Sequence, residues 1–357
     1  MILALDIGGA NTKFALIENH EVIRRGSFYF PFWKHKGKFN DFLSDLVNQK
    51  NFAKQNFNSQ YSLYCDEKIG DKIISELSAA GVTMTAELSD AFRSKEEGVN
   101  FILNCVEDVF SSLNVPVYVL SNNGNLISID AARKNPYGIA SANWIATSWY
   151  AAKKYKNCIL ADTGSTTTDI IPIREGKIAA AGKTDLERLQ TGELIYTGVL
   201  RTNIAAVVNS VPVRNNTTLV SSELFAATAD VYLILNEISE EDYSCETSDG
   251  RGKSRMECMA RLSRVVCADL HYELSEDEVV EIAKYIREKQ IEQIIECIGK
   301  VMKCDKGNKT ETLVAVGLGS FLVKEIAGRL NISLIESDLN PAGALGLMVE
   351  EKITDNF

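Results

Sequence analysis

Residues 3–18, LALDIGGANTKFALIE, place an aspartate and two glycines between two apolar runs. Apolar runs broken by glycine are typical of strands joined by a tight turn. Glycine lets a backbone approach a ligand closely, so that successive N–H groups can converge on phosphate oxygens. The stretch therefore predicts a β-hairpin whose turn binds phosphate, with Asp6 at its edge.

The same layout returns at 157–182, NCILADTGSTTTDIIPIREGKIAAAG. Asp162 takes the place of Asp6, and a glycine turn with Ser and Thr again separates two apolar runs. The two segments indicate an internal duplication. A third glycine turn, Gly317-Leu-Gly-Ser320, follows the apolar run TLVAV.

Apolar periodicity predicts strands that alternate with helices along the whole chain. The early strands are expected at 2–5, 13–18, 21–30, 61–65 and 115–121, and the helices at 39–50, 69–80, 98–113, 141–155, 276–303 and 321–330. The acidic stretch 236–256 is expected to be a long exposed loop. Alternation of this kind favours an α/β fold with a mostly parallel sheet.

The composition favours a small-molecule ligand. The chain has 357 residues, enough for two domains, and a formal net charge of −10, which gives no overall basic field for nucleic acid or an anionic membrane. We see no basic leader or membrane span and expect a cytoplasmic protein. The eight scattered cysteines predict free thiols in a reducing compartment.

The three turns together predict a phosphate-bearing ligand in an interdomain cleft, although each alone is also explained as an ordinary tight turn. The predicted phosphate-binding residues are Gly8, Gly9, Asn11, Thr12, Lys13, Gly164, Ser165, Thr166, Thr167, Gly317, Gly319 and Ser320. The carboxylates of Asp6 and Asp162 would repel a bare polyphosphate. We therefore expect both to bind a divalent cation, typically Mg²⁺, that bridges to the phosphates.

Several motifs resemble known families. DIGGANTK (6–13), DTGSTTTD (162–169) and VGLGS (316–320) resemble the two phosphate loops and the adenosine-side loop of the actin-like ATPase superfamily. The longer segments MTAELSDAF (84–92), GELIYTGVLRTN (192–203) and FAATADVYLIL (225–235) are similar to hydantoinase/oxoprolinase-like proteins linked to tetrahydromethanopterin one-carbon metabolism.

This resemblance covers nearly the whole chain and implies two ribonuclease-H-like domains that face an interdomain cleft. We place the first domain at 1–137, completed by a C-terminal helix at 341–352. The second is placed at 138–340, with a helical insertion at about 220–305.

Within that family the chain resembles most the branch that acts in methanofuran biosynthesis. The resemblance implies that [5-(aminomethyl)furan-3-yl]methyl diphosphate condenses with the phenol of γ-glutamyltyramine to give an aryl ether and pyrophosphate, without ATP. Ala10-Asn11 departs from the Gly-Thr/Ser pair common in the ATPases, which speaks against ordinary ATP hydrolysis and leaves nucleotide binding open.

This chemistry needs groups that stabilise departing pyrophosphate and a base that accepts the phenol proton. Lys13, and Asp162 together with its expected metal ion, suit the stabilisation of the departing pyrophosphate. The base candidates are Glu87, Asp90, Asp185 and Glu193, and the substrate-contact candidates are Asp185, Tyr196, Thr197 and Arg201. Each carboxylate is equally explained as a helix cap or as an ion-pair partner of Arg93, Arg188 or Arg201.

Two other classes of function fit the same motifs. One is an ATP-dependent small-molecule kinase or a hydantoinase/oxoprolinase-type amidohydrolase, and the other is a nucleotide-binding regulator without catalysis, because a fold does not fix a function. A homo-oligomer is compatible with every one of these alternatives.

Overall fold

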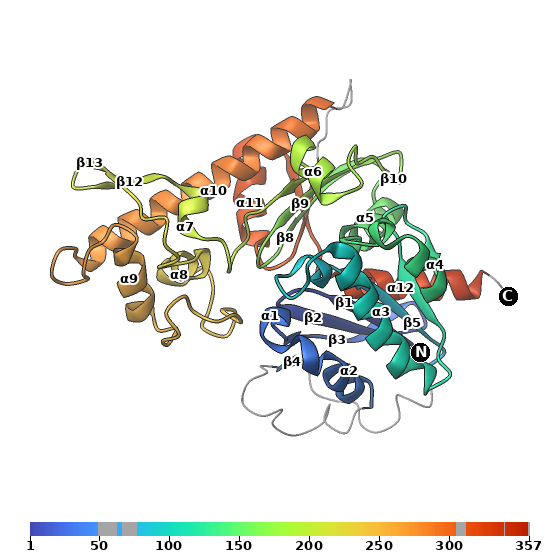
Figure 1. Ribbon diagram of the computed structural model, residues 1–357. Helices are drawn as coiled ribbons and strands as arrows, with labels where there is room; N and C mark the ends of the chain where they lie inside the picture. The colour runs from blue at the N-terminus through green and yellow to red at the C-terminus, as the bar shows by residue number, and fades with distance from the viewer. Residues whose placement is uncertain (49–62, 66–76, 305–311, 339, 356–357) are drawn as a thin grey trace. The chain divides into compact units, whose positions relative to one another are not determined.

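The computed structural model describes residues 1–48, 63–65, 77–304, 312–338 and 340–355 (Figure 1). The chain forms two compact units. The first contains Met1–Lys154 and the C-terminal segment Leu339–Phe357, and the second contains Tyr155–Asp338.

The first unit is built on a seven-stranded sheet in the order β4-β3-β2-β1-β5-β6-β7. Its strands are β1 (Ile2–Ile7), β2 (Asn11–Glu18), β3 (Glu21–Tyr29), β4 (Leu63–Cys65), β5 (Ala79–Met84), β6 (Val117–Leu120) and β7 (Leu126–Ile127). Strand β1 pairs antiparallel with β2 and parallel with β5.

The second unit repeats this topology in a smaller sheet of order β10-β9-β8-β14-β15, with β11 paired to β9. Its strands are β8 (Cys158–Thr163), β9 (Thr168–Arg174), β10 (Lys177–Ile178), β11 (Leu194–Ile195), β14 (Thr312–Val316) and β15 (Ser333–Glu336). Strand β8 again pairs antiparallel with the next strand and parallel with β14.

The two hairpins correspond residue by residue. Asp6 pairs with Lys13 in the first, and Asp162 pairs with Asp169 in the second. Each turn is closed by a 2.9 Å hydrogen bond, from the Gly8 amide to the Asn11 carbonyl and from the Gly164 amide to the Thr167 carbonyl. This correspondence supports the predicted duplication, and the shared strand order confirms the prediction of two ribonuclease-H-like units.

Helices cover both faces of the first sheet (Figure 1). They are α1 (Phe32–His35), α2 (Phe39–Asn48), α3 (Lys95–Ser111), α4 (Ile129–Lys134), α5 (Asn143–Lys154) and α12 (Pro341–Thr354), with 3₁₀ turns η1 (Lys36–Lys38), η3 (Ala86–Leu88) and η4 (Pro136–Gly138). Apolar side chains of β1, β2 and β5 pack with those of α2 and α3 in one core. Helix α12 packs on β1, β2 and β5 and also contacts α5.

The contact between α5 and α12 explains why the units divide at Lys154 rather than at the expected residue 137. Small residues allow the close approach of α12 to the sheet. A Cβ at Gly81 would lie 2.8 Å from Val349, and one at Gly346 would lie 2.1 Å from Ile17.

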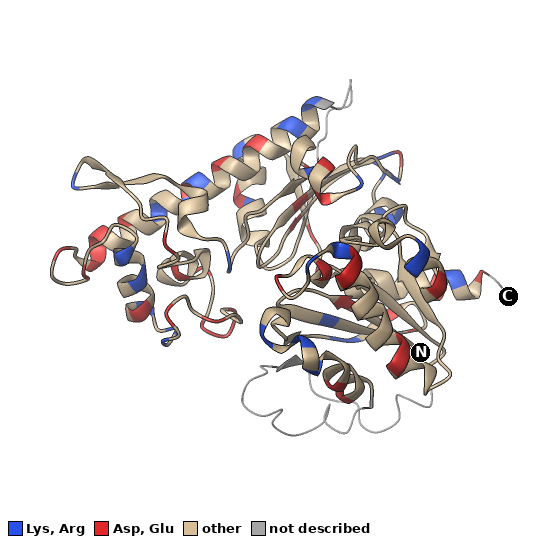
Figure 2. Ribbon diagram, in the orientation of Figure 1, with Lys and Arg blue, Asp and Glu red and all other residues tan. Residues whose placement is uncertain are grey.

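The second unit carries an insertion between β11 and β14. Its elements are α7 (Ile204–Val207), the hairpin β12 (Ser210–Val213) and β13 (Asn216–Leu219), α8 (Thr228–Ile234), α9 (Arg255–Arg264) and α10 (Glu276–Cys304). Outside the insertion lie α6 (Asp185–Thr191) and α11 (Ser320–Leu330). Lys, Arg, Asp and Glu are interspersed along α10 (Figure 2).

One expectation from the sequence is wrong, and another lies largely outside the described residues. Segment 236–256 is not simply an exposed loop, because Tyr243 and Cys245 are buried and Asp249 pairs with the buried Arg261 at 3.2 Å. The helix expected at 69–80 falls largely on residues outside the described ranges, and its last two residues begin β5 instead. That strand is buried on both faces, so it lacks the alternating pattern that marks a strand.

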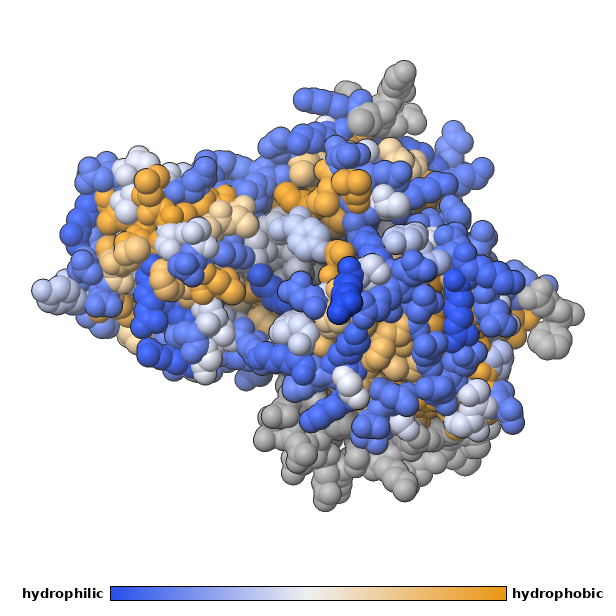
Figure 3. Space-filling view, in the orientation of Figure 1, coloured by the Kyte–Doolittle hydropathy of each residue, from blue (hydrophilic) through white to orange (hydrophobic). Residues whose placement is uncertain are grey.

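The described helices, the exposed hydrophobic residues and the cysteines can be compared with the expectations from the composition. None of the described helices is both long and apolar enough to cross a membrane. Figure 3 shows hydrophobic residues over the insertion, which contains the exposed Leu219, Leu224 and Met256. The cysteines whose side chains are described are free, and burial raises the pKa of the Cys158 thiol to about 11, which keeps it protonated and unreactive.

Candidate active site

The first glycine turn begins beside an ion pair between a buried aspartate and a partly exposed lysine. Asp6 lies at the carboxyl end of β1, opposite Lys13 on β2 and Thr83 on β5. Directly opposed residues of neighbouring strands share one face of a sheet, so these three side chains form a polar group there. The Lys13 Nζ atom lies 3.6 Å from Asp6 Oδ2, and the Lys13 side chain is 38% exposed. Lys13 is therefore placed to meet an anion at the turn.

Thr83 is a site residue that the sequence did not predict, because its strand β5 has no alternating pattern. It is fully buried, and its hydroxyl has no hydrogen-bond partner among the residues that the structure describes. Buried hydroxyls of this kind usually bind a water or a ligand oxygen.

The segment MTAELSDAF follows β5 and lies against the first turn. A Cβ at Gly8 would lie 3.5 Å from the Thr85 hydroxyl, and one at Gly9 would lie 3.7 Å from Ser89. Glu87 is buried and its Oε1 accepts a 2.9 Å hydrogen bond from Ser141, whereas Asp90 is exposed. Of these two predicted bases, Glu87 is the one in an enclosed setting.

The segment Thr197–Arg201 packs against the second glycine turn and is hydrogen-bonded to it. The amides of Val199 and Leu200 donate to the carbonyls of Gly164 and Ser165 at 3.0 and 2.9 Å. A Cβ at Gly198 would lie 2.5 Å from the amide nitrogen of Thr166, so only glycine fits there. Arg201 Nη1 lies 3.5 Å from the Thr166 hydroxyl, which brings its charge to the turn.

The third turn lies beside the second. Gly317 has a φ of +86°, and a Cβ on it would lie 2.6 Å from Asp162 Oδ1. The Gly319 amide donates to the carbonyl of Thr163 at 2.9 Å, and helix α11 begins at the next residue. Helix N-termini favour anions. The second unit therefore gathers two of the three predicted phosphate turns around Asp162.

Other predicted residues have structural partners. Thr197 is buried, and its hydroxyl accepts a 2.8 Å hydrogen bond from Gln290. Asp185 lies in the first turn of α6, and Tyr196 is 52% exposed. Arg188 is buried and pairs with Asp169, which is not one of the carboxylates that the ion-pair alternative considered.

Glu193 is held by three donors rather than poised as a base. It is buried, and its carboxylate accepts hydrogen bonds from the amides of Ala181 at 2.6 Å and Gly182 at 2.8 Å and from the hydroxyl of Thr191 at 2.9 Å. Together these donors occupy lone pairs on both carboxylate oxygens. This geometry supports a structural role for Glu193.

Glu193→Gln is expected to lower the free energy of unfolding by about 1–3 kcal/mol, because the new amide group would face backbone N–H donors. Thermal unfolding measures the loss. If Glu193 were instead the base, the variant would lose turnover and the acid limb of the pH–rate profile while keeping its melting temperature.

The metal prediction rests on two carboxylates in different units. Among the described residues, no group of three or more His, Cys, Asp or Glu side chains could hold a metal ion. Asp6 and Asp162 are hard oxygen ligands, which fit Mg²⁺, and that ion commonly completes its shell with phosphate oxygens and water. The bridging ion stays a prediction.

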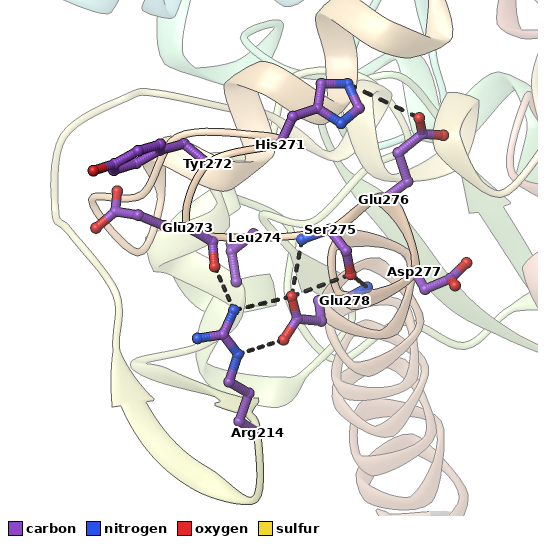
Figure 4. Close-up of a pocket in the computed structure, with 9 residues that line it drawn as sticks. All are labelled: Arg214, His271, Tyr272, Glu273, Leu274, Ser275, Glu276, Asp277 and Glu278. Carbon is purple, nitrogen blue, oxygen red and sulfur yellow. Dashed lines mark hydrogen bonds and ion pairs between the residues drawn. The ribbon is translucent and has the colours of Figure 1, made fainter.

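The second unit also has a pocket that the sequence did not predict (Figure 4). It has a volume of about 600 Å³ and lies between the tip of the β12–β13 hairpin and the start of α10. Arg214 from the tip pairs with Glu278 at 2.6 Å, and its guanidinium also donates to the carbonyl of Glu273. Glu276 and Asp277 add negative charge, so the pocket does not suit a diphosphate.

Arg214→Met is expected to raise the pKa of Glu278, which the hydrogen bond from Arg214 and then the Ser275 amide lower to about 2 from its ordinary 4.5. A lowered carboxyl pKa means that the contact is complete above pH 4.5 and is lost as pH falls through about 2. Carboxyl NMR titration measures the shift. Lys284→Met, which removes the partner of Glu281 on the same helix, should leave Glu278 unchanged.

Comparison with known proteins connects this geometry to a family. The model of the family described as hydantoinase/oxoprolinase matches residues 78–345. A protein of Methanocaldococcus jannaschii named (4-{4-[2-(gamma-L-glutamylamino)ethyl]phenoxymethyl}furan-2-yl)methanamine synthase is 41% identical over 94% of this chain and 91% of its own. A Methanococcus vannielii protein of the same name is 44% identical over 50% of this chain and 78% of its own.

A solved structure extends the likeness to the fold. Nucleotide-free acetone carboxylase aligns with 97% of this chain and 69% of its own at a TM-score of 0.55, with 8% sequence identity. At that identity the likeness concerns the fold, and it agrees with the α/β arrangement of two related units.

Proposed function

Since the chain belongs to the hydantoinase/oxoprolinase family, we propose that it is the aryl-ether-forming transferase of methanofuran biosynthesis. The observation that carries this proposal is 41% identity to the Methanocaldococcus jannaschii synthase over 94% of the chain. The name of that synthase describes a product in which a phenoxymethyl group joins a γ-glutamylaminoethyl phenyl ring to a furan. The substrates are then a furan diphosphate and γ-glutamyltyramine.

The reaction transfers the furanylmethyl group. The bond between the furan methylene carbon and the diphosphate oxygen breaks, and its electron pair leaves with pyrophosphate. The phenol oxygen forms the new bond to that carbon, and its proton passes to a base. A furan ring spreads positive charge at the methylene, so the enzyme mainly has to stabilise the leaving group and exclude water.

The glycine turns supply the groups for the first task. Amides of the second and third turns, with the N-terminus of α11 and the guanidinium of Arg201, suit one diphosphate. Lys13 offers a further charge at the first turn. Asp6 and Asp162 are proposed to hold Mg²⁺, which would neutralise charge on the departing pyrophosphate.

Glu87 is the proposed base. Its buried position after β5, beside the first turn, suits a carboxylate that accepts a proton from a phenol with a reference pKa of about 10. Asp90 is exposed, Asp185 is half-buried in the first turn of α6, and Glu193 is occupied by three donors, which leaves Glu87 as the best placed of the four predicted carboxylates.

The test is an incubation of the purified protein with both substrates and Mg²⁺, without ATP. The expected outcome is pyrophosphate and an ether whose mass equals that of both substrates less pyrophosphoric acid. ATP-dependent phosphate release with another substrate, and no ether, would favour the kinase or amidohydrolase alternative. Tight nucleotide binding without any turnover would favour a regulator.

A further inference from the structure

Two buried side chains of the insertion connect the second and third glycine turns. Tyr232 on α8 and Gln290 on α10 are both fully buried, and the Tyr232 hydroxyl donates to Gln290 Oε1. The Tyr232 ring packs edge-on against Phe321, with ring centroids 5.3 Å apart. Phe321 directly follows the third turn, so Tyr232 contacts the residue that adjoins this turn, which we call its support.

The direction of these hydrogen bonds is fixed. Burial raises the pKa of the Tyr232 phenol far above its ordinary value, so the hydroxyl keeps its proton and donates it. Gln290 Oε1 is then the acceptor, and Gln290 Nε2 faces the opposite way. It donates to the hydroxyl of Thr197 at 2.8 Å and to the carbonyl of Gly198 at 2.9 Å.

Thr197 and Gly198 in turn hold the second turn. The carbonyl of Thr197 accepts from the hydroxyl of Thr168 at 2.7 Å, at the start of β9. The Gly198 backbone packs closely against the second turn, because a Cβ on Gly198 would lie 2.5 Å from the Thr166 nitrogen. Gly198 is fixed further by Thr228 on α8, whose hydroxyl donates to its carbonyl at 2.9 Å. A shift of Gln290 would therefore shift the Gly164–Thr167 turn.

We propose that Tyr232 and Gln290 are positioning residues that set the second and third glycine turns at the spacing needed to bind one diphosphate. The inference rests on the proposed function for its substrate. Its physical basis is separate, because the hydrogen bonds and the ring contact of the two side chains lie at Thr197, Gly198 and Phe321, which adjoin the turns. Through these two residues, the insertion would hold the turns that bind the leaving diphosphate in fixed positions.

Two variants test this role. Tyr232→Phe removes one hydroxyl and keeps the ring on Phe321, and Gln290→Met keeps the side-chain length but removes both hydrogen-bonding groups. Gln293→Met is the matched control, because Gln293 lies on the same helix and donates instead to the carbonyl of Val207 at 3.1 Å. We expect Gln290→Met to raise KM for the furan diphosphate and Kd for inorganic pyrophosphate by about 10- to 100-fold, as with other residues that orient binding groups.

Hydrogen exchange gives a readout that does not depend on the reaction. Amides 164–167 and 319–321 should exchange faster in both variants and should not change in Gln293→Met. A variant that loses melting temperature but keeps wild-type exchange, KM and pyrophosphate affinity would overturn the inference, since its role would be packing alone. If the wild-type protein makes no ether, the proposed function fails, and unchanged exchange in the variants would overturn the positioning role separately.

Discussion

Asp162→Asn is expected to abolish measurable turnover, a loss of about 1000-fold or more, while the protein stays folded. The carboxylate lies at the carboxyl end of β8, directly opposite Asp169 and against Gly317, where the second and third turns meet. Asparagine keeps the shape of the side chain but removes the negative charge, so the proposed Mg²⁺ would lose a ligand. Steady-state pyrophosphate release measures the loss.

The matched control is Asp108→Asn, the same substitution at an exposed position on α3. Its turnover should stay within about a factor of two of the wild-type value, and its melting temperature should change by no more than a few degrees, as is usual for surface substitutions. Near-normal turnover in Asp162→Asn would remove the metal-clamp hypothesis. Loss of folding in that variant, seen by circular dichroism, would instead assign Asp162 to structure.

Gly198→Ala should lower turnover by about 100-fold, because the new methyl group would force the second turn to move and small displacements at a reacting centre are costly. Its Cβ would lie 2.5 Å from the Thr166 nitrogen and 2.6 Å from the Ser165 carbonyl carbon. The same overlap should reduce the free energy of unfolding by about 1–3 kcal/mol. Steady-state kinetics and thermal unfolding measure the two effects.

Gly299→Ala provides the opposite case in the same unit. Gly299 lies inside α10, and apart from its chain neighbours and the nearby helix backbone, no atom of the described residues lies within 4 Å of the position that an alanine methyl group would take there. Alanine should therefore stabilise the protein by about 0.5–1 kcal/mol and leave turnover unchanged. Equal activity of the two alanine variants would contradict the view that Gly198 supports the second turn.

The glycine turns were predictable because their chemistry is local. Asp6 and Asp162 each lie beside a turn within a few residues of chain, so the hairpins and their shared layout are visible in the sequence. Long helices such as α10 are equally visible, since their periodicity runs over many turns.

The supports of these turns were not predictable. Thr83 belongs to a strand with no alternating pattern, and the link from Gln290 to Thr197 joins residues 93 positions apart. Glu193 looked like a candidate base because its backbone donors, Ala181 and Gly182, lie in a loop on the far side of α6 and follow no regular spacing from it. Burial and partners over such separations depend on tertiary packing, which periodicity does not encode.

The discontinuity of the first unit has a consequence for the order of folding during synthesis. Its sheet is covered on one side by α12, which follows the entire second unit in the chain. The second unit is continuous and can complete its core as soon as residue 338 has left the ribosome, whereas the first must wait for residues 341–354. We therefore expect the second unit to complete its core before the first, in contrast to the usual order in which the N-terminal domain folds first.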